Sequence, residues 1–295
     1  MALRRDLRIS GLLVLGHSSR VPAVRLPGEP GGARRGTQWS VIRTLLSTVG
    51  RTSKGIRTGY RHGFDSGTML DYVYVNRARG LLGIGRLIDR VYLNAIGWRA
   101  IRARRDLLQE VLRQEIARRP GREVFILDVA AGPGRYLQDL IAPYPPGRVR
   151  VLCRDLAGPG LWQGERLARE RGLQNIAYEM GDALAPRTPA EGPPDVIVVS
   201  GLYELLLDDA TIQRSLNRLR TLLAPGGTLV FTTQTHHPQL DFIANVLPNR
   251  NGDLWVMKCR PAEEPESWAK AAGFTATSTR SEKLGLFTVT TCTTT

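Results

Sequence analysis

The sequence contains few cysteines and no long apolar run. Cys153, Cys259 and Cys292 are widely separated, so their spacing supports neither a disulfide framework nor a zinc site, and no metal-binding residue is predicted. The apolar run Ile9 to Gly16 is too short to cross a bilayer, and no Ala-x-Ala cleavage pattern follows it. These absences favour a cytoplasmic globular protein and leave a transit peptide as a lesser alternative.

Acidic residues are scarce in the front of the chain. Residues 1–120 hold 23 Lys and Arg against 8 Asp and Glu, whereas the remainder is nearly neutral. Residues 1–37, rich in Pro, Gly and Arg, are predicted to form a flexible basic leader. The first interpretation of the basic residues in 1–120 is that they serve solubility or the solvation of helices. Contact with an anionic membrane or a phosphorylated substrate, and then RNA binding, remain as alternatives.

Residues 124–136 combine an apolar strand, a carboxylate and a turn of small residues, Val-Phe-Ile-Leu-Asp-Val-Ala-Ala-Gly-Pro-Gly-Arg-Tyr. The strand delivers Asp128 to the carboxyl edge of a parallel sheet, and the small residues let the backbone approach a ligand. An acid before the turn would repel a pyrophosphate, so the pattern favours a cationic cofactor over a dinucleotide. The residues of this turn expected to bind the cofactor are Ala130, Gly132, Gly134 and Tyr136, with negative φ required at Ala130.

Two further acids follow successive strands. Asp155 closes the strand over 148–155, about 20 residues beyond the turn, where a carboxylate binds ribose hydroxyls. Asp182 follows a third strand that begins at Ile176. For either acid alone, a helix cap or a turn residue is an equally good interpretation. Three acids at three strand ends together favour one ligand pocket.

The remaining segments predict an α/β fold. A continuous apolar run at 195–199 is typical of a strand that is buried on both faces. A helix over 211–223, a Pro-Gly-Gly turn and a strand over 228–233 follow it. The expected fold is a Rossmann-like seven-stranded, mostly parallel sheet, closed by an antiparallel hairpin over 274–279 and 286–292.

The segment over 38–120 is predicted to be a helical N-terminal cap. Two helical stripes occur in it, and most of their residues are expected to pack against the sheet domain. Tyr72, Tyr74 and Tyr92 lie in or near the intervening region and are candidates for substrate binding. The two stripes consist of Trp39, Ile42, Leu45, Leu46 and Val49, and of Leu87, Ile88, Val91, Tyr92 and Ala95.

The acid and glycine turn at 128–134 resemble the first motif of class I S-adenosylmethionine (SAM) methyltransferases. The resemblance implies a SAM-dependent methyltransferase domain over 121–295, in which the turn passes under the methionine part of the cofactor. It also implies that Asp155 binds the ribose and that Asp182 accepts from the adenine amine. The other cofactor-binding residues implied are Leu156, Gly181, Ala183, Ser200 and Gly201.

Two regions outside the cofactor motifs narrow this resemblance. Residues 54–99 and 232–241, together with Trp255-Val-Met, are similar to one methyltransferase subfamily, whose members often form the C-terminal half of bifunctional α/β-hydrolase/methyltransferase proteins. Where the subfamily has Gln-Pro-Trp-His-Pro-Gln, this chain has Gln-Thr-His-His-Pro-Gln over 234–239, which changes the expected substrate more than the cofactor. No Gly-x-Ser-x-Gly nucleophile motif is present, so the methyltransferase half alone is predicted.

Methyl transfer from a sulfonium is an in-line displacement, and a general base assists when the acceptor is a hydroxyl. The candidates at the sheet edge are Tyr203, Glu204, His236 and His237, with Gln234 as a substrate-binding residue. Alternatively a histidine braces its loop, and Glu204 contacts the cofactor ammonium or caps a helix.

The sequence therefore predicts a methyltransferase that acts on a small-molecule or lipid-like acceptor at oxygen. No Asn-Pro-Pro-Tyr type of motif follows the fourth strand, which disfavours a base amine and hence nucleic acid as acceptor. An RNA methyltransferase guided by the basic front and a non-catalytic SAM-binding module remain as alternatives. The oligomeric state is not predicted.

Overall fold

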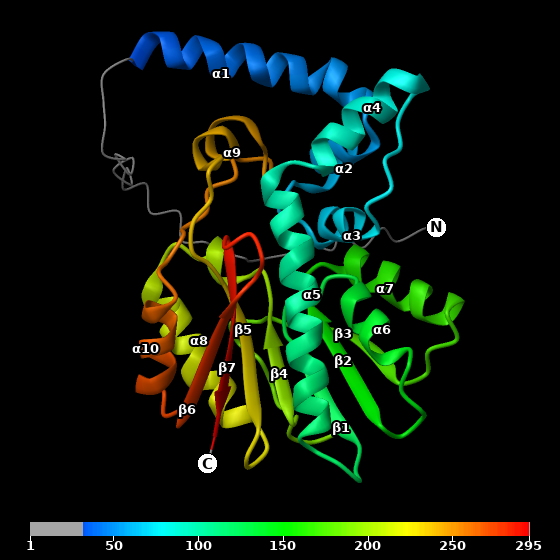
Figure 1. The fold of residues 1–295 in the computed structure, drawn as a ribbon, viewed down its shortest axis with the longest axis vertical. Coiled ribbons are helices and arrows are strands. Elements are labelled where there is room, and N and C mark those ends of the chain that lie inside the picture. The colour runs from blue at the N-terminus through cyan, green and yellow to red at the C-terminus, as the bar shows by residue number, and fades with distance from the viewer. Residues whose placement is uncertain (1–31, 295) are drawn as a thin grey trace, which may run out of the picture.

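The computed structural model describes residues 32–294, which form one seven-stranded sheet with helices on both faces and a helical cap above it (Figure 1). The strand order is β3-β2-β1-β4-β5-β7-β6, in which β7 runs antiparallel to both β5 and β6 and the other neighbours are parallel. The predicted fold class is confirmed. The strands are β1 (Val124–Asp128), β2 (Val149–Asp155), β3 (Ile176–Met180), β4 (Val196–Val199), β5 (Thr228–Gln234), β6 (Ala276–Ser281) and β7 (Phe287–Thr293).

Successive side chains along the central strands point to opposite faces of the sheet, and this divides the core into two layers. In β1, Val124 and Ile126 join a cluster with α5 and α6, whereas Phe125 and Leu127 join a cluster with α8 and α10. Because both faces of β1 are covered, all five of its residues are buried. The helices that flank the sheet are α5 (Ile96–Ala117), α6 (Arg135–Ile141), α7 (Gly158–Glu170), α8 (Asp209–Leu222) and α10 (Glu263–Ala271).

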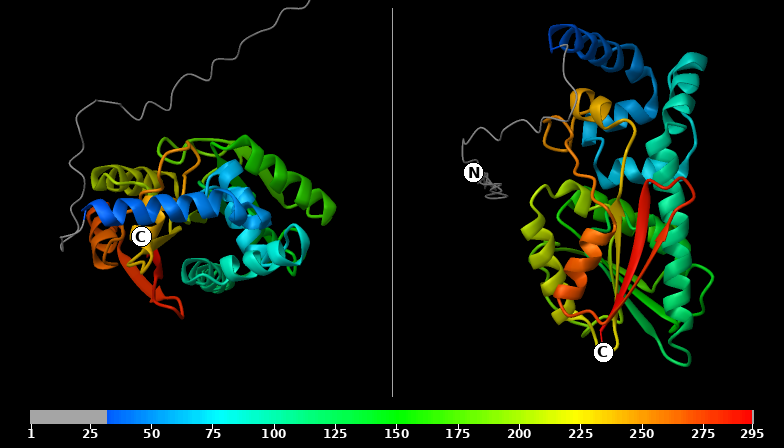
Figure 2. Two further views of the ribbon diagram at one scale, coloured as in Figure 1. Left: turned by 90° about the horizontal axis from the view of Figure 1, so that it is seen from above. Right: turned by 60° about the vertical axis from the view of Figure 1, so that its left-hand side comes forward.

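The cap lies over the carboxyl ends of the parallel strands, at the top of Figure 1 and of the right-hand view of Figure 2. A chain of aromatic contacts forms its core: Phe64 meets Tyr92, Tyr92 meets Trp98, and Trp98 stacks on Trp255. The cap consists of α1 (Gly32–Ser47), η1 (Val49–Thr52), α2 (Lys54–His62), α3 (Gly67–Val75), α4 (Leu82–Leu93), the first half of α5, and α9 (Leu240–Val246).

Helix α5 contributes to the cores of both the cap and the sheet domain. Trp98 and Ile101 pack in the cap, whereas Leu108 and Leu112 pack in the core of the sheet. A long helix that contributes to both cores couples the orientation of the cap to the sheet. The second half of α5 therefore belongs to the sheet domain, although the sequence places all of 38–120 in the cap.

The predicted leader over 1–37 falls for the most part outside the described residues. Its last residues, from Gly32 onward, already belong to α1, so the helix begins earlier than the sequence suggests. Trp39 of α1 contacts Phe242 of α9, and Ile42 and Leu46 pack against the same cap core, whereas Leu45 stays 56% exposed. Within residues 32–294, no helix is both long and apolar enough to span a membrane.

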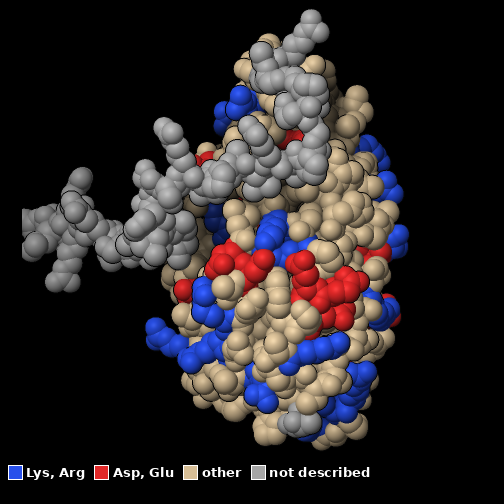
Figure 3. All heavy atoms as spheres, turned by 90° about the vertical axis from the view of Figure 1, so that its left-hand side faces the viewer, with Lys and Arg blue, Asp and Glu red and all other residues tan. Residues whose placement is uncertain are grey.

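Charge is distributed differently on the sheet domain and on the cap. On the face that carries α8 and α10, Lys and Arg are interspersed with Asp and Glu (Figure 3), including three acids in the first turn of α10. In the cap, by contrast, the carboxylates of Asp71 and Asp89 are buried. The exposed charge on α4 is therefore cationic and comes from Arg86 and Arg90.

Candidate functional site

The turn after β1 brings mainly backbone and small side chains to the carboxyl edge of the sheet. Gly132 and Gly134 have φ of +53° and +63°, a region that side chains disfavour. A Cβ at Gly134 would lie 2.7 Å from the Cys153 sulfur, so glycine is required there on steric grounds as well. Ala130 does not have positive φ, as its Cβ requires.

Asp128 supports this turn from below. Its carboxylate accepts a hydrogen bond from the Ala130 amide at 3.1 Å and one from the Tyr136 hydroxyl at 2.5 Å. The side chain is completely buried, and burial raises the pKa of Asp128 to about 7 despite these two donors. Asp128 therefore shapes the turn and titrates close to neutral pH.

This pKa gives stability a specific pH dependence. The folded-state pKa of Asp128 exceeds its unfolded value of 3.8, so its contribution is complete below pH 3.8 and is lost as the pH rises through 7. Asp128→Asn should remove that loss, which is of the order of 4 kcal/mol between pH 4 and 8 at about 1.4 kcal/mol per pKa unit. Urea unfolding at both pH values measures it, with the partly exposed Asp139→Asn as control. An unchanged pH dependence would contradict the assignment.

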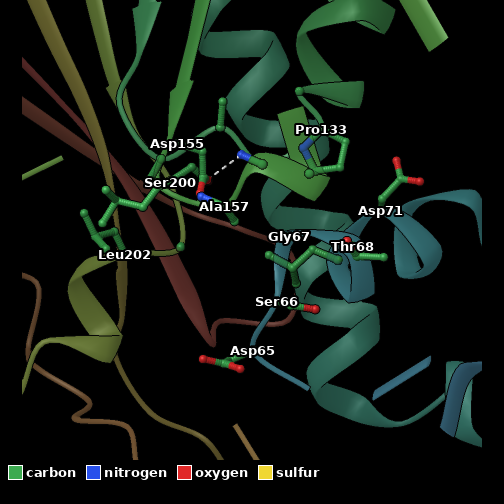
Figure 4. A pocket seen from close by; sticks show the side chains of 18 of the residues that line it. Asp65, Ser66, Gly67, Thr68, Asp71, Pro133, Asp155, Ala157, Ser200 and Leu202 are labelled. Carbon is green, nitrogen blue, oxygen red and sulfur yellow. Dashed lines mark hydrogen bonds between the residues drawn. The ribbon is translucent and has the colours of Figure 1, made fainter. Parts of the chain in front are cut away.

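Asp155, at the end of β2, holds the other side of the turn. Its two oxygens accept from the amides of Gly132 and Ala157, each at 2.8 Å, and the first bond is drawn in Figure 4. Each carboxylate oxygen retains a lone pair for a further donor. The predicted ribose-binding residue is therefore already oriented by the backbone.

A cavity of about 220 Å³, here called the turn cavity, lies above the glycine turn. The cap closes it, because Gly67 packs directly on the turn: a Cβ added at Gly132 would lie 3.1 Å from the Gly67 Cα. Asp65 and Asp71 line it from the cap side (Figure 4). The predicted residues that line it are Ala130, Gly132, Gly134, Tyr136, Asp155, Leu156, Ala183, Ser200 and Gly201, together with Tyr74.

Three predicted cofactor residues do not line this cavity. Asp128 lies under the turn, and Gly181 packs against the Arg154 side chain. Asp182 accepts from the Leu184 amide at 2.8 Å, which is the role of a turn residue. Only its neighbour Ala183 reaches the cavity, so the adenine contact of Asp182 stays a prediction.

Asp155 differs from the other carboxylates of the turn cavity, because those are paired with arginines. Arg135, directly after the turn, is bound by Asp71 of the cap, and Gln163 donates to the same carboxylate at 2.7 Å. Asp65 pairs with Arg250 at 3.1 Å. Among the described residues, Asp155 is thus the one carboxylate lining the cavity that has no cationic partner. Asp65 and Asp71 were not predicted, and their only signal in the sequence is their position within residues 54–99, which resemble the methyltransferase subfamily.

A second cavity of about 210 Å³, here called the cap cavity, lies between the cap and the ends of β4 and β5. Its lining is mainly apolar and aromatic, with Trp98, Trp255 and Phe287 among its walls. The predicted residues Tyr92, Gln234, Glu204 and His237 also line it. The two cavities adjoin, since both are lined by Asp65, Leu70, Gly201 and Leu205.

Arg104 and Glu204 form a buried ion pair in the wall of the cap cavity. The Arg104 Nη1 donates to Glu204 Oε1 at 3.0 Å, and the two side chains are 2% and 6% exposed. Glu204 Oε2 and Arg104 Nε have no protein partner although both are buried. Buried polar atoms without a partner are rare in native proteins, which suggests that a ligand completes these bonds.

His237 faces the cap cavity as a hydrogen-bond donor. Its Nδ1 accepts from the Gln239 amide at 3.0 Å, so a neutral ring carries its proton on Nε2. Burial, with the charge of the adjacent His236, lowers the pKa of His237 to about 4, so the ring is neutral at pH 7. Since Nε2 is then protonated, His237 can donate to a ligand but is not suited to be the predicted general base. His236 is exposed and lines neither cavity.

Two other predicted residues lie away from both cavities. Tyr203 belongs to the core between β5 and α8, where its hydroxyl meets Ser215 at 3.2 Å and burial raises its pKa. Tyr72 donates to the buried Asp89 at 2.5 Å and so braces the cap. A catalytic role for Tyr203 and substrate contact by Tyr72 are therefore not supported, because their hydroxyls already have structural partners.

The fold is that of class I methyltransferases, whose methyl donor is SAM. The SAM-dependent methyltransferase SibL aligns with a TM-score of 0.55 at 16% identity, covering 89% of this chain and 76% of that one. Magnesium protoporphyrin IX methyltransferase from Synechocystis PCC 6803, solved with bound SAH, aligns with a TM-score of 0.54 at 11% identity, covering 87% and 99%.

The sequence comparisons identify the family. Residues 17–294 match a family described as "Putative methyltransferase", and the chain belongs to this family. The "Uncharacterized protein YnbC" of Escherichia coli (strain K12) is 39% identical over 257 residues, which are 84% of this chain. The match spans 43% of that relative's length.

Proposed function

We propose that the turn cavity binds SAM and that the cap cavity binds the methyl acceptor. The single observation that carries this proposal is the common wall of the two cavities, which Gly201 and Leu205 form at the end of β4. In doubly wound sheets, ligands bind at this edge, where the strand order reverses between β1 and β4. Because the two cavities adjoin at these residues, SAM in the turn cavity and an acceptor in the cap cavity would lie next to each other.

The residues of the turn cavity fit SAM. Gly132 and Gly134 keep its floor free of side chains, and Asp155 offers lone pairs to the ribose hydroxyls. With Asp71 and Arg135 neutralised by each other, Asp155 gives the cavity a net negative charge, which suits a sulfonium and disfavours a phosphate. When bound, SAM supplies a methyl group on a positively charged sulfur.

The cap cavity fits a small-molecule or lipid-like acceptor. Its walls are mainly aromatic and aliphatic, and its few polar groups include Arg104, which lies beside Gly201. A small, mainly apolar cavity of this kind favours such an acceptor over RNA. We also propose a cytoplasmic location, which three unpaired cysteines support.

The polar groups of the cap cavity support methylation at oxygen. Glu204 Oε2, buried and without a partner, can accept the hydrogen bond of an acceptor hydroxyl and take its proton as the oxygen attacks the methyl group. Arg104 holds the carboxylate in place through Oε1. His237 can donate its Nε2 proton to a second oxygen of the acceptor and orient it. We therefore assign the base to Glu204 and an orienting role to His237.

Calorimetry with SAM, followed by incubation with SAM carrying a deuterated methyl group, tests the proposal. We expect heat of binding with SAM, and transfer of the label to molecules in small-molecule or lipid extracts, as detected by mass spectrometry. Absence of heat would reject the cofactor assignment. Binding without label transfer to any extract would favour a non-catalytic SAM-binding module, and label in RNA would favour the RNA methyltransferase.

A further inference from the structure

Helix α4 presents an apolar face to solvent. Leu81, Leu82, Ile84, Leu87 and Val91 are 55%, 87%, 59%, 62% and 68% exposed. Leu87 and Val91 belong to a helical stripe most of whose residues were expected to pack against the sheet domain, but these two side chains are exposed. Five large apolar side chains on and beside one short helix form an unusual surface for a soluble domain.

The reason for this orientation is Asp89, which directs the opposite side of α4 inward. Its carboxylate accepts from Ser53 and Tyr72, each at 2.5 Å, and from the amides of Gly55 and Arg79 at 2.7 and 2.8 Å. Four donors compensate for the burial of this charge. The helix is thus held with a carboxylate inside and leucines outside.

Leu82 is the most exposed of these side chains and has a φ of +55°. The left-handed region is unfavourable for a bulky residue by about 1–2 kcal/mol. The turn at Leu82 seats the start of α4 against η1, because the Leu81 amide donates to the Thr52 carbonyl at 2.8 Å and Gly85 packs closely on the same carbonyl. The Leu82 side chain is left in solvent.

An arginine-lined depression borders the apolar face. Arg77, Arg79, Arg86 and Arg90 are exposed and line it, and none takes part in an ion pair within residues 32–294. The only carboxylates in the sequence between residues 66 and 105 are those of Asp71 and Asp89, both buried. The surface of α4 therefore combines an apolar ridge with unpaired guanidinium groups.

From this combination we infer that α4 docks on an anionic phospholipid bilayer. The apolar side chains would enter the boundary between headgroups and acyl chains, and the arginines would bind lipid phosphates. A second copy is a poorer partner, because a two-fold contact through this face would bring identical arginines together. We call Leu81, Leu82, Ile84, Leu87, Val91 and the four arginines the α4 surface.

The α4 surface leads to the cap cavity. Val91 is exposed and also lines that cavity, as does Leu46 of α1. An amphiphilic acceptor could thus pass from the bilayer toward Glu204 without crossing water. This route depends on the proposed function of the cap cavity, whereas docking itself does not.

Co-sedimentation of the full chain with vesicles tests the inference. We expect binding to vesicles of equal parts phosphatidylglycerol and phosphatidylcholine, and at least about tenfold weaker binding to phosphatidylcholine alone. Leu82→Ser/Leu87→Ser should weaken binding to the anionic vesicles about tenfold, and Arg86→Gln/Arg90→Gln about as much. The leucine variant changes only the apolar contribution to binding, and the arginine variant removes positive charge; neither adds a negative charge.

The matched controls are Leu207→Ser, an exposed leucine elsewhere, and Arg113→Gln on α5, both expected to bind like the parent. Light scattering without vesicles and calorimetry with SAM accompany every variant. Parent-like binding by Leu82→Ser/Leu87→Ser would overturn the inference, as would a dimer that this substitution dissociates. Vesicle binding without SAM binding would instead reject only the proposed function.

Discussion

Glu204→Gln is expected to lower the rate of methyl transfer by about 10²–10⁴-fold, the usual contribution of a general base. The carboxylate oxygen Oε2 is buried, has no partner and lies in the wall of the cap cavity. An amide keeps the size of the side chain and can still accept from Arg104, but it cannot take a proton. The affinity for SAM should change less than threefold, because Glu204 does not line the turn cavity.

Glu115→Gln is the control for the effect of losing a buried ion pair in Glu204→Gln. Glu115 is 2% exposed and pairs with Arg119 at 2.9 Å, yet it lines neither cavity. Glu115→Gln should therefore lose stability, as Glu204→Gln does, and keep its rate. The rate is measured as transfer of the deuterated methyl group into the extract fraction that the parent methylates. Equal rate losses in both variants, or a parallel loss of SAM binding in Glu204→Gln, would reject the assignment.

Asp155→Asn is expected to weaken SAM binding by about 10–100-fold, since hydrogen bonds to a charged group contribute about 1.5–3 kcal/mol. Both carboxylate oxygens already accept from backbone amides, so the amide group of Asn would turn a donor toward Gly132 or Ala157. The variant also loses the charge that attracts the sulfonium. Calorimetry with SAM measures the effect directly.

Asp208 supplies the matched control for this substitution. Its carboxylate also accepts two backbone amides, those of Ala210 and Thr211, but it caps α8 outside both cavities. Because asparagine is an equally good N-cap residue, Asp208→Asn should leave both stability and SAM binding close to those of the parent. A less than twofold change in Asp155→Asn would show that the ribose is bound elsewhere.

The succession of strands along the chain and the cofactor-binding edge could be predicted from the sequence because their signals are local. An apolar run that ends in Asp128 and a glycine turn defines a strand, a sheet edge and a backbone conformation within a few residues. The next strand and Asp155 follow at the spacing of a βαβ unit. Likewise, the alternation of β-rich runs near the C-terminus predicts the hairpin of β6 and β7, which the structure confirms.

The ion pairs that line the two cavities could not be predicted, because their partners come from distant segments of the chain. Arg104 and Glu204 are 100 positions apart, and Arg135 and Asp71 are separated by 64. No periodicity relates such pairs. The protonation of His237 is also a tertiary property, since it depends on burial and on the direction of the Gln239 amide.

The sequence by itself determined the class of fold and the edge at which a cofactor can bind, since strand period, turn chemistry and spacing are properties of neighbouring residues. Only the tertiary structure decided which carboxylates are neutralised and which side of α4 faces solvent. A buried Asp89 with four donors turns the leucines of that helix outward, and this follows from contacts that close only when the chain has folded.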